Sequence, residues 1–346
     1  MTQQADEKAS FQTGLQISPA TDAPWNLSAV VGQLRQSREV TNKIRHRGRV
    51  RELPSRLILT EILDGLAAAL FPTHYGRSDL TDDSIDYFVG NTLHTALTGL
   101  TEQVRRSLSF ISTPNDQPDA DLAGQARGIT YAFADQLPAI RALLVDDLLA
   151  AFQGDPAATS VSEILVCYPG FAAIIHYRMA HALHRLGAPF IARLISSIAH
   201  STTGIDIHPA AEIGAGFFID HGTGVVIGET AIIGEHVRLY QAVTLGAKRL
   251  PADENGTLIK GSPRHPIIED NVIIYAGATV LGRITVGRNS TIGGNVWLTQ
   301  SVPAGSVVTQ AQSRHAETEA GIAISHTGQP APAADRRSGR PNGLRA

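Results

Sequence analysis

Residues 205–245 read IDIHPAAEIGAGFFIDHGTGVVIGETAIIGEHVRLYQAVTL, and aliphatic side chains recur in them at every sixth position. An amphipathic helix would repeat near 3.6 residues and a half-buried strand at two, so neither explains this spacing. A six-residue period is the hexapeptide signature of a parallel β-helix, in which each short strand turns a branched side chain inward. Two sets of positions, offset by two residues, carry the period: Ile207, Ile213, Ile219, Val225, Ala231, Val237 and Val243, and Ile227, Ile233, Leu239 and Leu245.

The six-residue period breaks once and then resumes. Val243 and Val272 are 29 residues apart, which is not a multiple of six, and from Val272 the period continues to Val308. Residues 248–264, KRLPADENGTLIKGSPR, are polar and rich in glycine and proline, so they are predicted to form a loop thrown out of the coil. Long loops on a rigid scaffold are often functional, and this one ends at Arg264, next to His265.

Upstream of the coil, apolar residues follow a helical period instead. Helices are predicted over 27–51, 55–71, from Thr81 to Ile111, over 121–136 and 138–153, briefly after Ser160, and over 171–186 and 189–202. The chain is therefore divided into a loose tail (1–26), a helical domain (27–203), a β-helix domain (204–310) and a C-terminal tail (311–346). The last is rich in Ala, Pro, Gly and Arg, and we expect it to be disordered.

Composition excludes several classes of function. The 346 residues carry a net charge of −3, which gives no reason to expect nucleic acid or an anionic membrane as partner. The N-terminus lacks a basic start followed by an apolar run, and no stretch of about 20 apolar residues exists, so neither a signal peptide nor a membrane span is expected. A single cysteine, Cys167, fits a reducing compartment, and a cytoplasmic protein is predicted.

His221 is the first candidate for chemistry. It falls in phase with Ile227, so it is predicted to point inward at a position where an aliphatic residue would be expected, with Asp220 directly before it. Asp206 lies 15 residues earlier, and coils of about 18 residues would make it a near neighbour of His221 on the stacked coil. A carboxylate behind an imidazole fixes its tautomer, as general-base catalysis needs. A buried histidine satisfied by its surroundings is the alternative.

The candidate residues together describe a pocket for one class of substrate. His221 supplies a base, carboxylates supply acceptors for an ammonium group, and Arg264 beside His265 supplies a cation for a carboxylate. That set suits a zwitterionic amino acid with a hydroxyl group to deprotonate. Three histidines at 176, 181 and 184 are a weaker candidate, because their spacing puts only two on one helix face and no carboxylate lies among them.

Longer strings of sequence resemble one family. They are Asp155-Pro156-Ala157, Tyr168-Pro169-Gly170-Phe171, Tyr177-Arg178, DIHPAAEIG from Asp206, DHGTG from Asp220, VIGETA from Val226, VTLG from Val243, and Arg264-His265-Pro266. Over about residues 150–308 the chain resembles a serine O-acetyltransferase of the hexapeptide-repeat acyltransferase superfamily, in a long N-terminal form. The fold class expected is thus α+β: an all-α N-terminal helical domain followed by a C-terminal left-handed parallel β-helix of hexapeptide repeats.

The resemblance implies roles for individual residues. His221 resembles the general base, Asp206 its dyad partner and His265 a second active-site histidine. Asp155 and Asp220 match carboxylates that hold the substrate ammonium, and Arg264 matches the residue that binds the substrate carboxylate. Contacts to coenzyme A are implied for Gly246, Ala247, Ala276 and Gly294, although the family more often has glycine at position 247.

The implied reaction transfers acetyl from acetyl-CoA to the hydroxyl of L-serine, giving O-acetyl-L-serine and CoA, the first step from serine to cysteine. No permanently bound cofactor and no metal are expected, and acetyl-CoA is a co-substrate. The resemblance implies a homotrimer or a dimer of trimers. It leaves binding to cysteine synthase open, because the sequence ends in Gly343-Leu344-Arg345-Ala346 and not in the isoleucine that many members insert into that enzyme.

Two alternatives stay open at this point. The first is a hexapeptide acyltransferase with another hydroxyl acceptor, although a sugar has no charged groups for Arg264 and Asp155 to pair with. The second is a metalloenzyme of the γ-carbonic anhydrase kind, which needs three imidazoles converging on zinc. His221 and His265 could supply two, but no third histidine has matching spacing.

Overall fold

The structure is a computed structural model that describes residues 26–41, 52–111, 119–248, 254, 258–310, 315–318 and 321–324. The chain divides into two units, Met1–Val50 and Arg51–Ala346. In the first unit, α1 (Leu27–Gln36) is capped by Asn26, whose side chain accepts a hydrogen bond from the Ala29 amide, and leads into the short π-helix η1 (Ser37–Thr41). The predicted helix over 27–51 is confirmed for α1, and its end, like the tail 1–25, lies outside the described residues.

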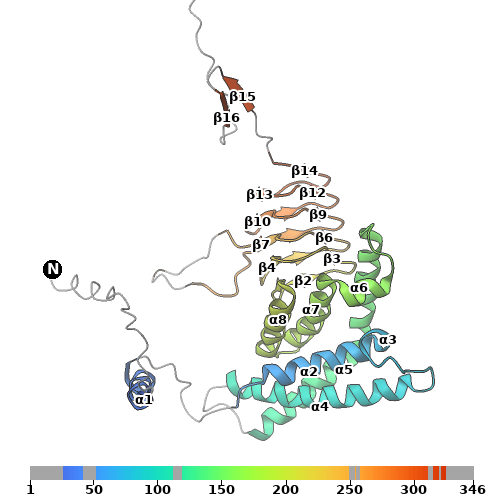
Figure 1. Ribbon diagram of the computed structural model, residues 1–346, viewed down its shortest axis with the longest axis vertical. Coiled ribbons are helices and arrows are strands. Elements are labelled where there is room, and N and C mark those ends of the chain that lie inside the picture. The colour runs from blue at the N-terminus through green and yellow to red at the C-terminus, as the bar shows by residue number, and fades with distance from the viewer. Residues whose placement is uncertain are drawn as a thin grey trace, which may run out of the picture. The chain divides into compact units, whose positions relative to one another are not determined.

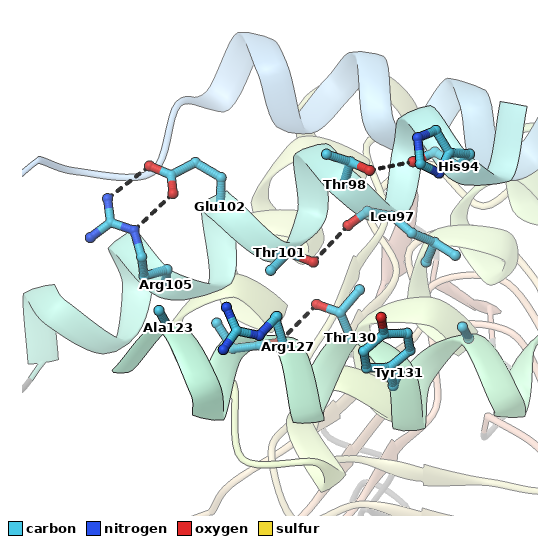
Figure 2. Close-up of a pocket in the computed structure, with 12 residues that line it drawn as sticks. His94, Leu97, Thr98, Thr101, Glu102, Arg105, Ala123, Arg127, Thr130 and Tyr131 are labelled. Carbon is cyan, nitrogen blue, oxygen red and sulfur yellow. Dashed lines mark hydrogen bonds and ion pairs between the residues drawn. The ribbon is translucent and has the colours of Figure 1, made fainter. Parts of the chain in front are cut away.

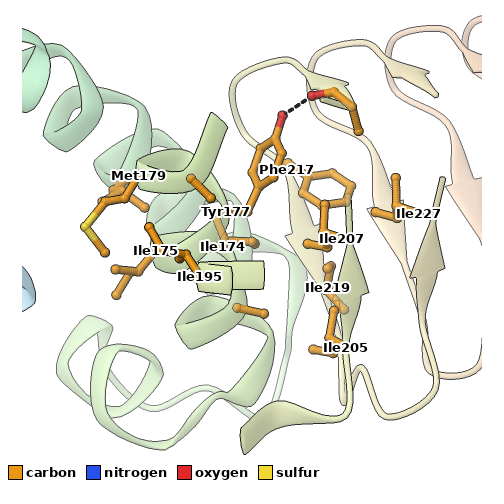
Figure 3. Close-up of a cluster of buried hydrophobic side chains, with 14 of the residues drawn as sticks. Ile174, Ile175, Tyr177, Met179, Ile195, Ile205, Ile207, Phe217, Ile219 and Ile227 are labelled. Atoms are coloured by element: carbon orange, nitrogen blue, oxygen red, sulfur yellow. Dashed lines mark hydrogen bonds between the residues drawn. The ribbon is translucent and has the colours of Figure 1, made fainter. Parts of the chain in front are cut away.

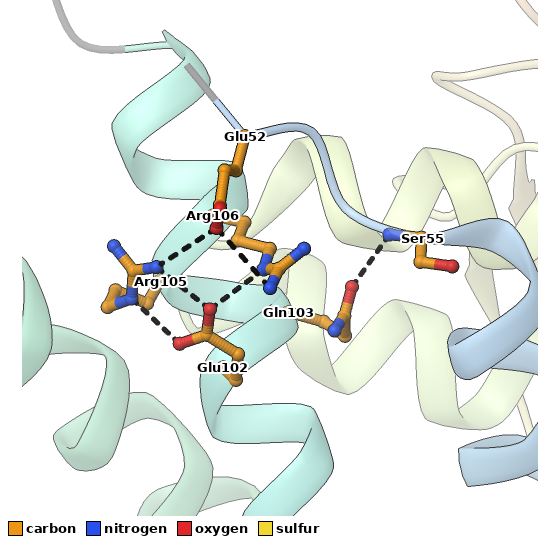
Figure 4. A network of polar contacts seen from close by, with 6 residues as sticks. All are labelled: Glu52, Ser55, Glu102, Gln103, Arg105 and Arg106. Carbon is orange, nitrogen blue, oxygen red and sulfur yellow. Dashed lines mark hydrogen bonds and ion pairs between the residues drawn. The ribbon is translucent and has the colours of Figure 1, made fainter.

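The second unit begins with the predicted helical part (Figure 1). Its helices are α2 (Arg56–Leu70), α3 (Pro72–Tyr75), α4 (Ile85–Ile111), α5 (Asp119–Gly154), α6 (Val161–Cys167), α7 (Pro169–Arg185) and α8 (Pro189–Thr203). Polar contacts fix the start of α2 against α4 (Figure 4), where buried Gln103 accepts a 2.7 Å hydrogen bond from the Ser55 amide. In the described part of the chain, no helix is long and apolar enough to cross a membrane.

Two helix predictions are corrected. The helices predicted at 121–136 and 138–153 are one continuous helix, α5, with Pro138 inside it. Proline removes one helical hydrogen bond, but the buried positions Phe133, Leu137, Ile140 and Leu144 keep one stripe across it, so packing holds both halves on a common axis. The helix predicted from Thr81 begins only at Ile85, after a turn.

Downstream, the chain winds into the coils of a left-handed parallel β-helix, with three sheets as its faces (Figure 1). Sheet A holds β1 (Asp206–Ile207), β4 (Val226–Ile227), β7 (Thr244–Gly246), β10 (Thr279–Leu281) and β13 (Trp297–Leu298). Sheet B holds β2 (Glu212–Ile213), β5 (Ile232–Ile233), β8 (Ile267–Ile268) and β11 (Thr285–Val286). Sheet C holds β3 (Phe218–Ile219), β6 (Arg238–Leu239), β9 (Ile273–Ile274), β12 (Thr291–Ile292) and β14 (Val307–Val308).

The strand register shows a longer interval at the place of the predicted loop. Leu245 pairs with Val280, 35 residues later, whereas Ile227 pairs with Leu245, 18 residues later. The difference of 17 residues equals the length of the loop predicted at 248–264. A β-helix can expel such a segment because the strands on either side of it still pair directly, as Ile233 does with Ile268.

The same register corrects the predicted orientation of His221. Ile207 pairs with Ile227, so the first coil has 20 residues and holds two more than the next coil. The extra residues fall in the connection from Asp220 to Gly224, between sheet C and sheet A, which we call the first C–A corner. The apparent phase of His221 with Ile227 is therefore broken. His221 lies at this corner with a positive φ of 56°, and 70% of its side chain is exposed.

The helical part and the β-helix share one core (Figure 3). Ile174 and Ile195 from α7 and α8 pack with Ile207 and Phe217 of the first coil, and all four are almost completely buried. Gly170 marks the closest approach. A Cβ atom at this position would overlap the backbone oxygen of Ile219, the residue directly before Asp220.

The described part of the C-terminal tail forms one hairpin. Strands β15 (His315–Thr318) and β16 (Gly321–Ile324) pair as an antiparallel hairpin. These residues depart from the disorder predicted over 311–346. The rest of that tail lies outside the described residues, and the prediction for it stays a prediction.

We predict that Gly170→Ala lowers the free energy of unfolding by about 1–3 kcal/mol, because the new methyl group must displace the backbone of β3. Gly128→Ala is the matched control, since Gly128 is an exposed position of α5 and no atom lies within 4 Å of the place that its new methyl group would take. That change should raise stability by about 0.5–1 kcal/mol through helix propensity. Chemical denaturation of both variants measures this, and equal effects would contradict the close contact.

Candidate functional site

Four polar side chains gather near the first C–A corner. Asp155 follows the C-terminal end of α5, and its Oδ2 accepts a 2.6 Å hydrogen bond from the hydroxyl of Tyr168, between α6 and α7. Its Oδ1 accepts a 2.8 Å bond from the Ala157 amide. Asp220 and His221 come from the corner itself, with 3.8 Å between Asp220 Oδ1 and His221 Nδ1. Asp155 and Tyr168 are therefore joined to each other, and Asp220 lies beside the exposed imidazole.

The pKa values of this group reflect its mutual contacts. The Tyr168 hydroxyl, the Ala157 amide and the nearby charges of His221 and Arg238 hold the pKa of Asp155 below its usual range. Hydrogen bonding to Asp155, with weaker repulsion from Glu163 and Asp220, raises the pKa of Tyr168 to about 12. Asp155 is therefore an anion, and the phenol a donor, throughout the neutral pH range.

The structure does not join Asp206 to His221. Asp206 begins β1 and pairs with Val226, a residue that follows the first C–A corner. Within the described residues, however, no hydrogen bond or ion pair connects their side chains, and the carboxylate beside the imidazole belongs to Asp220. The two extra residues of the first coil account for the difference.

Arg264 and His265 lie at a different corner, between sheet A and sheet B, which we call the A–B corner. Arg264 Nη2 forms a 2.5 Å ion pair with Glu229 Oε2. The backbone amides of Arg264 and His265 donate to Thr230 Oγ1 at 2.9 and 3.1 Å. Thr230 therefore holds the end of the excursion loop at one place on the coil, and Glu229 holds the guanidinium.

The tautomer of His265 follows from its contacts. Its Nδ1 accepts a 3.0 Å hydrogen bond from the Thr230 amide, so the proton of the neutral ring lies on Nε2. The ring lies across Gly228, where a Cβ atom would overlap Nε2. Burial, followed by the charge of Arg264, lowers the pKa of His265. His265 is therefore a neutral Nε2–H donor.

The helix α7 histidines do not form a cluster for chemistry. His176 and His181 are half-buried and hydrogen-bonded to the backbone oxygens of Ala172 and Pro209. Burial lowers the pKa of both. Among the residues that the structure describes, no three His, Cys, Asp or Glu side chains are arranged to hold a metal ion, which is the arrangement that a zinc enzyme needs.

The four residues expected to contact coenzyme A also fall into two groups. Ala276 and Gly294 lie at two successive C–A corners further along the coil, which stack on each other because the Asn295 amide donates to the Ala276 oxygen at 2.9 Å. Gly246 ends β7, and Ala247 follows it where the excursion loop begins. Each is at least partly exposed, so their backbone groups are accessible along the edges of the coil.

Sequence reasoning missed Tyr168, Glu229 and Thr230 as parts of the site. All three stand inside strings that carried the family resemblance, and that is the signal that could have identified them. Their partners are distant in sequence: Thr230 and Arg264 are 34 residues apart. Periodicity alone cannot predict such pairs.

A groove between α4 and α5 forms a cavity of about 550 Å³ (Figure 2). Its three threonine hydroxyls are already used, since Thr98, Thr101 and Thr130 each donate to a backbone oxygen of their own helix. None of the candidate site residues lines it.

Comparisons with known proteins agree with this geometry. Residues 265–300 match the family model described as bacterial transferase hexapeptide (six repeats). A plasmid-encoded serine acetyltransferase of Synechococcus elongatus is 53% identical over 321 residues, covering 90% of this chain and 100% of the relative. A serine acetyltransferase of Mycobacterium tuberculosis is 47% identical over 162 residues, covering 47% of this chain and 67% of the relative.

One solved structure is similar over most of its length. Serine acetyltransferase 1 of Entamoeba histolytica, crystallised with L-cysteine, superposes with a TM-score of 0.64 at 36% identity, covering 82% of this chain and 97% of that one. Identity of 53% over the entire length of a relative excludes a different family that shares only the coil. This chain belongs to the serine acetyltransferase family of hexapeptide-repeat acyltransferases.

Proposed function

We propose that this chain transfers the acetyl group of acetyl-CoA to the hydroxyl of L-serine, giving O-acetyl-L-serine and CoA as the first step towards cysteine. The observation that carries the proposal is an exposed imidazole, His221, that lies beside the carboxylate of Asp220 and close enough to Asp155 to lower its pKa, at one corner of the coil. An acceptor with both an ammonium and a hydroxyl group suits that arrangement, and an uncharged sugar does not.

His221 is the general base of the proposed reaction. Its ring takes the proton from the serine hydroxyl while the oxygen attacks the thioester carbonyl, and the carbon–sulfur bond then breaks. The CoA sulfur leaves with the proton that the imidazole has carried. A nearby carboxylate stabilises the imidazolium that forms in between. Asp220 stands nearest in the structure, and Asp206 on the adjoining coil is proposed as the dyad partner once substrate orders the ring.

Substrate recognition rests on charge pairing at both ends of the amino acid. Asp155 and Asp220 are proposed to hold the ammonium group. Arg264 is proposed to bind the carboxylate, with its guanidinium already oriented by Glu229. His265 acts as a second active-site group, and its Nε2–H makes it a hydrogen-bond donor rather than a base.

The proposed site needs a second copy of the chain. Within the described residues, no hydrogen bond or ion pair joins the group around His221 to the group around Arg264, and the two occupy different corners of the coil. In a homotrimer, packed about an axis along the coil, one corner of each copy can meet a different corner of the next. Acetyl-CoA would then lie along that junction, contacting Gly246, Ala247, Ala276 and Gly294. Pairing of trimers and a cytoplasmic location complete the proposal.

We predict that the purified protein releases thiol from acetyl-CoA with L-serine and does so poorly with other hydroxyl acceptors. His221→Ala should lower kcat by roughly 10²–10⁴, because general-base catalysis is lost, while the Kd for acetyl-CoA stays within about twofold. Asp206→Asn should lower kcat less, since Asp206 only orients the base. The assay uses a panel of amino acids and sugars. Turnover of another acceptor without turnover of serine would overturn the function, and near-normal turnover by His221→Ala would move the role of base elsewhere.

We predict that Arg264→Ala lowers kcat/KM for serine much more than kcat/KM for serine methyl ester, which lacks the carboxylate. Losing one partner of a desolvated charge pair costs about 2–5 kcal/mol in kcat/KM, and the ester has no charge to strand. Arg264→Lys should also lower kcat/KM for serine, because lysine cannot donate two parallel hydrogen bonds to the carboxylate. The measurement is kcat/KM for both acceptors with each enzyme. Equal losses for serine and its ester would show that Arg264 serves only to hold the loop beside Glu229.

A further inference from the structure

Tyr168 is a residue to which neither the resemblance nor the charge-pairing argument assigns a role. It lies between α6 and α7 with φ −88° and ψ 114°, an extended conformation. Pro169 follows directly, and contact with the proline ring disfavours the helical region for the residue before it. The sequence Tyr-Pro therefore fixes the backbone from which the phenol projects.

The phenol is directed at one oxygen of one carboxylate. Tyr168 donates a 2.6 Å hydrogen bond to Asp155 Oδ2, and the Ala157 amide donates 2.8 Å to Oδ1. Asp155 itself follows the last turn of a long helix, where its side chain would otherwise choose among rotamers. With both oxygens held, each still has acceptor capacity for a further donor.

Nearby charged groups influence the pKa values of both Asp155 and Tyr168. The charges of His221 and Arg238 lower the pKa of Asp155. The charges of Asp155, Glu163 and Asp220 raise the pKa of Tyr168. Hydrogen bonding from the phenol is the largest influence that keeps Asp155 acidic. Removing only the hydroxyl would therefore change both the orientation of the carboxylate and the pH at which it takes up a proton.

We propose that Tyr168 is a positioning residue for the ammonium group of the acceptor amino acid, acting through Asp155. This inference rests on the proposed function, in which Asp155 holds that ammonium. The phenol touches neither the hydroxyl that reacts nor the thioester. Its effect therefore falls on the binding of serine and on the pH dependence of that binding, and not on the chemical step.

The test is Tyr168→Phe, which removes one oxygen and keeps the ring. We expect the KM for serine to rise by about 10-fold, the loss of one hydrogen bond to a charged group, while kcat and the KM for acetyl-CoA stay within about twofold. Asp155 gains a proton more readily without the phenol, so the acid limb of kcat/KM for serine moves to higher pH. A ¹³C NMR titration of the Asp155 carboxyl should show the same upward shift in pKa.

Tyr177→Phe is the matched control. Tyr177 lies on α7 and also donates a 2.6 Å bond, but to the backbone oxygen of Ala211 in the buried core (Figure 3). It should lower the Tm and leave the serine KM and the acid limb unchanged. If Tyr168→Phe instead lowers only the Tm, or raises the KM of both substrates alike, its role is structural and the inference is overturned.

The outcomes separate this inference from the proposed function. If the wild-type enzyme acetylates serine, and Tyr168→Phe has the same serine KM and the same acid limb, the proposed function stands and the inference about Tyr168 is overturned. If the wild-type enzyme does not acetylate serine, both the proposed function and the inference about Tyr168 are overturned. An upward shift of the Asp155 pKa without any change in serine KM would show that the phenol acts on Asp155 while Asp155 does not bind the ammonium, which also overturns the inference.

Discussion

One buried ion pair fixes the helical part onto the β-helix. Arg178 of α7 forms two parallel hydrogen bonds with Asp147 of α5, at 3.0 and 2.9 Å, and neither side chain is more than 5% exposed. The same guanidinium donates 2.6 Å bonds to the backbone oxygens of Ile213 and Gly214, and Asp147 accepts from the Phe217 amide. Removal of either partner would leave a buried charge uncompensated, which commonly costs about 3–5 kcal/mol.

The position of the candidate site depends on this pair. Asp147 lies two turns before the end of α5, and Asp155 follows that end. Arg178 lies on α7, whose first residue follows Tyr168. The contacts that Arg178 makes with the first coil thus set both groups against the corner that carries Asp220 and His221. A change at Asp147 would be felt at a carboxylate eight residues away without touching it.

Much of the fold was predictable because a β-helix repeats locally. The six-residue spacing indicated the faces of the coil, and one irregular interval together with a polar composition indicated the loop. Errors arose where one element departs from its own rule: two additional residues in the first coil moved His221 outward, and continuous packing carried α5 through Pro138. The site residues recognised from the sequence were the charged ones inside family motifs. The residues that hold them, such as Thr230 and Tyr168, have partners that only the folded chain brings near.

The excursion loop has a consequence for how this protein can vary. The strands on either side of the loop pair directly with their neighbours, Leu245 with Val280 in sheet A and Ile233 with Ile268 in sheet B. This pairing does not depend on the residues between 248 and 264. The downstream foot of the loop, in contrast, is fastened to Thr230. Insertions or deletions in the loop would therefore leave the arginine and histidine at its foot in place. The loop is therefore a point where evolution, or an engineer, can change the length and chemistry of the chain without altering the scaffold.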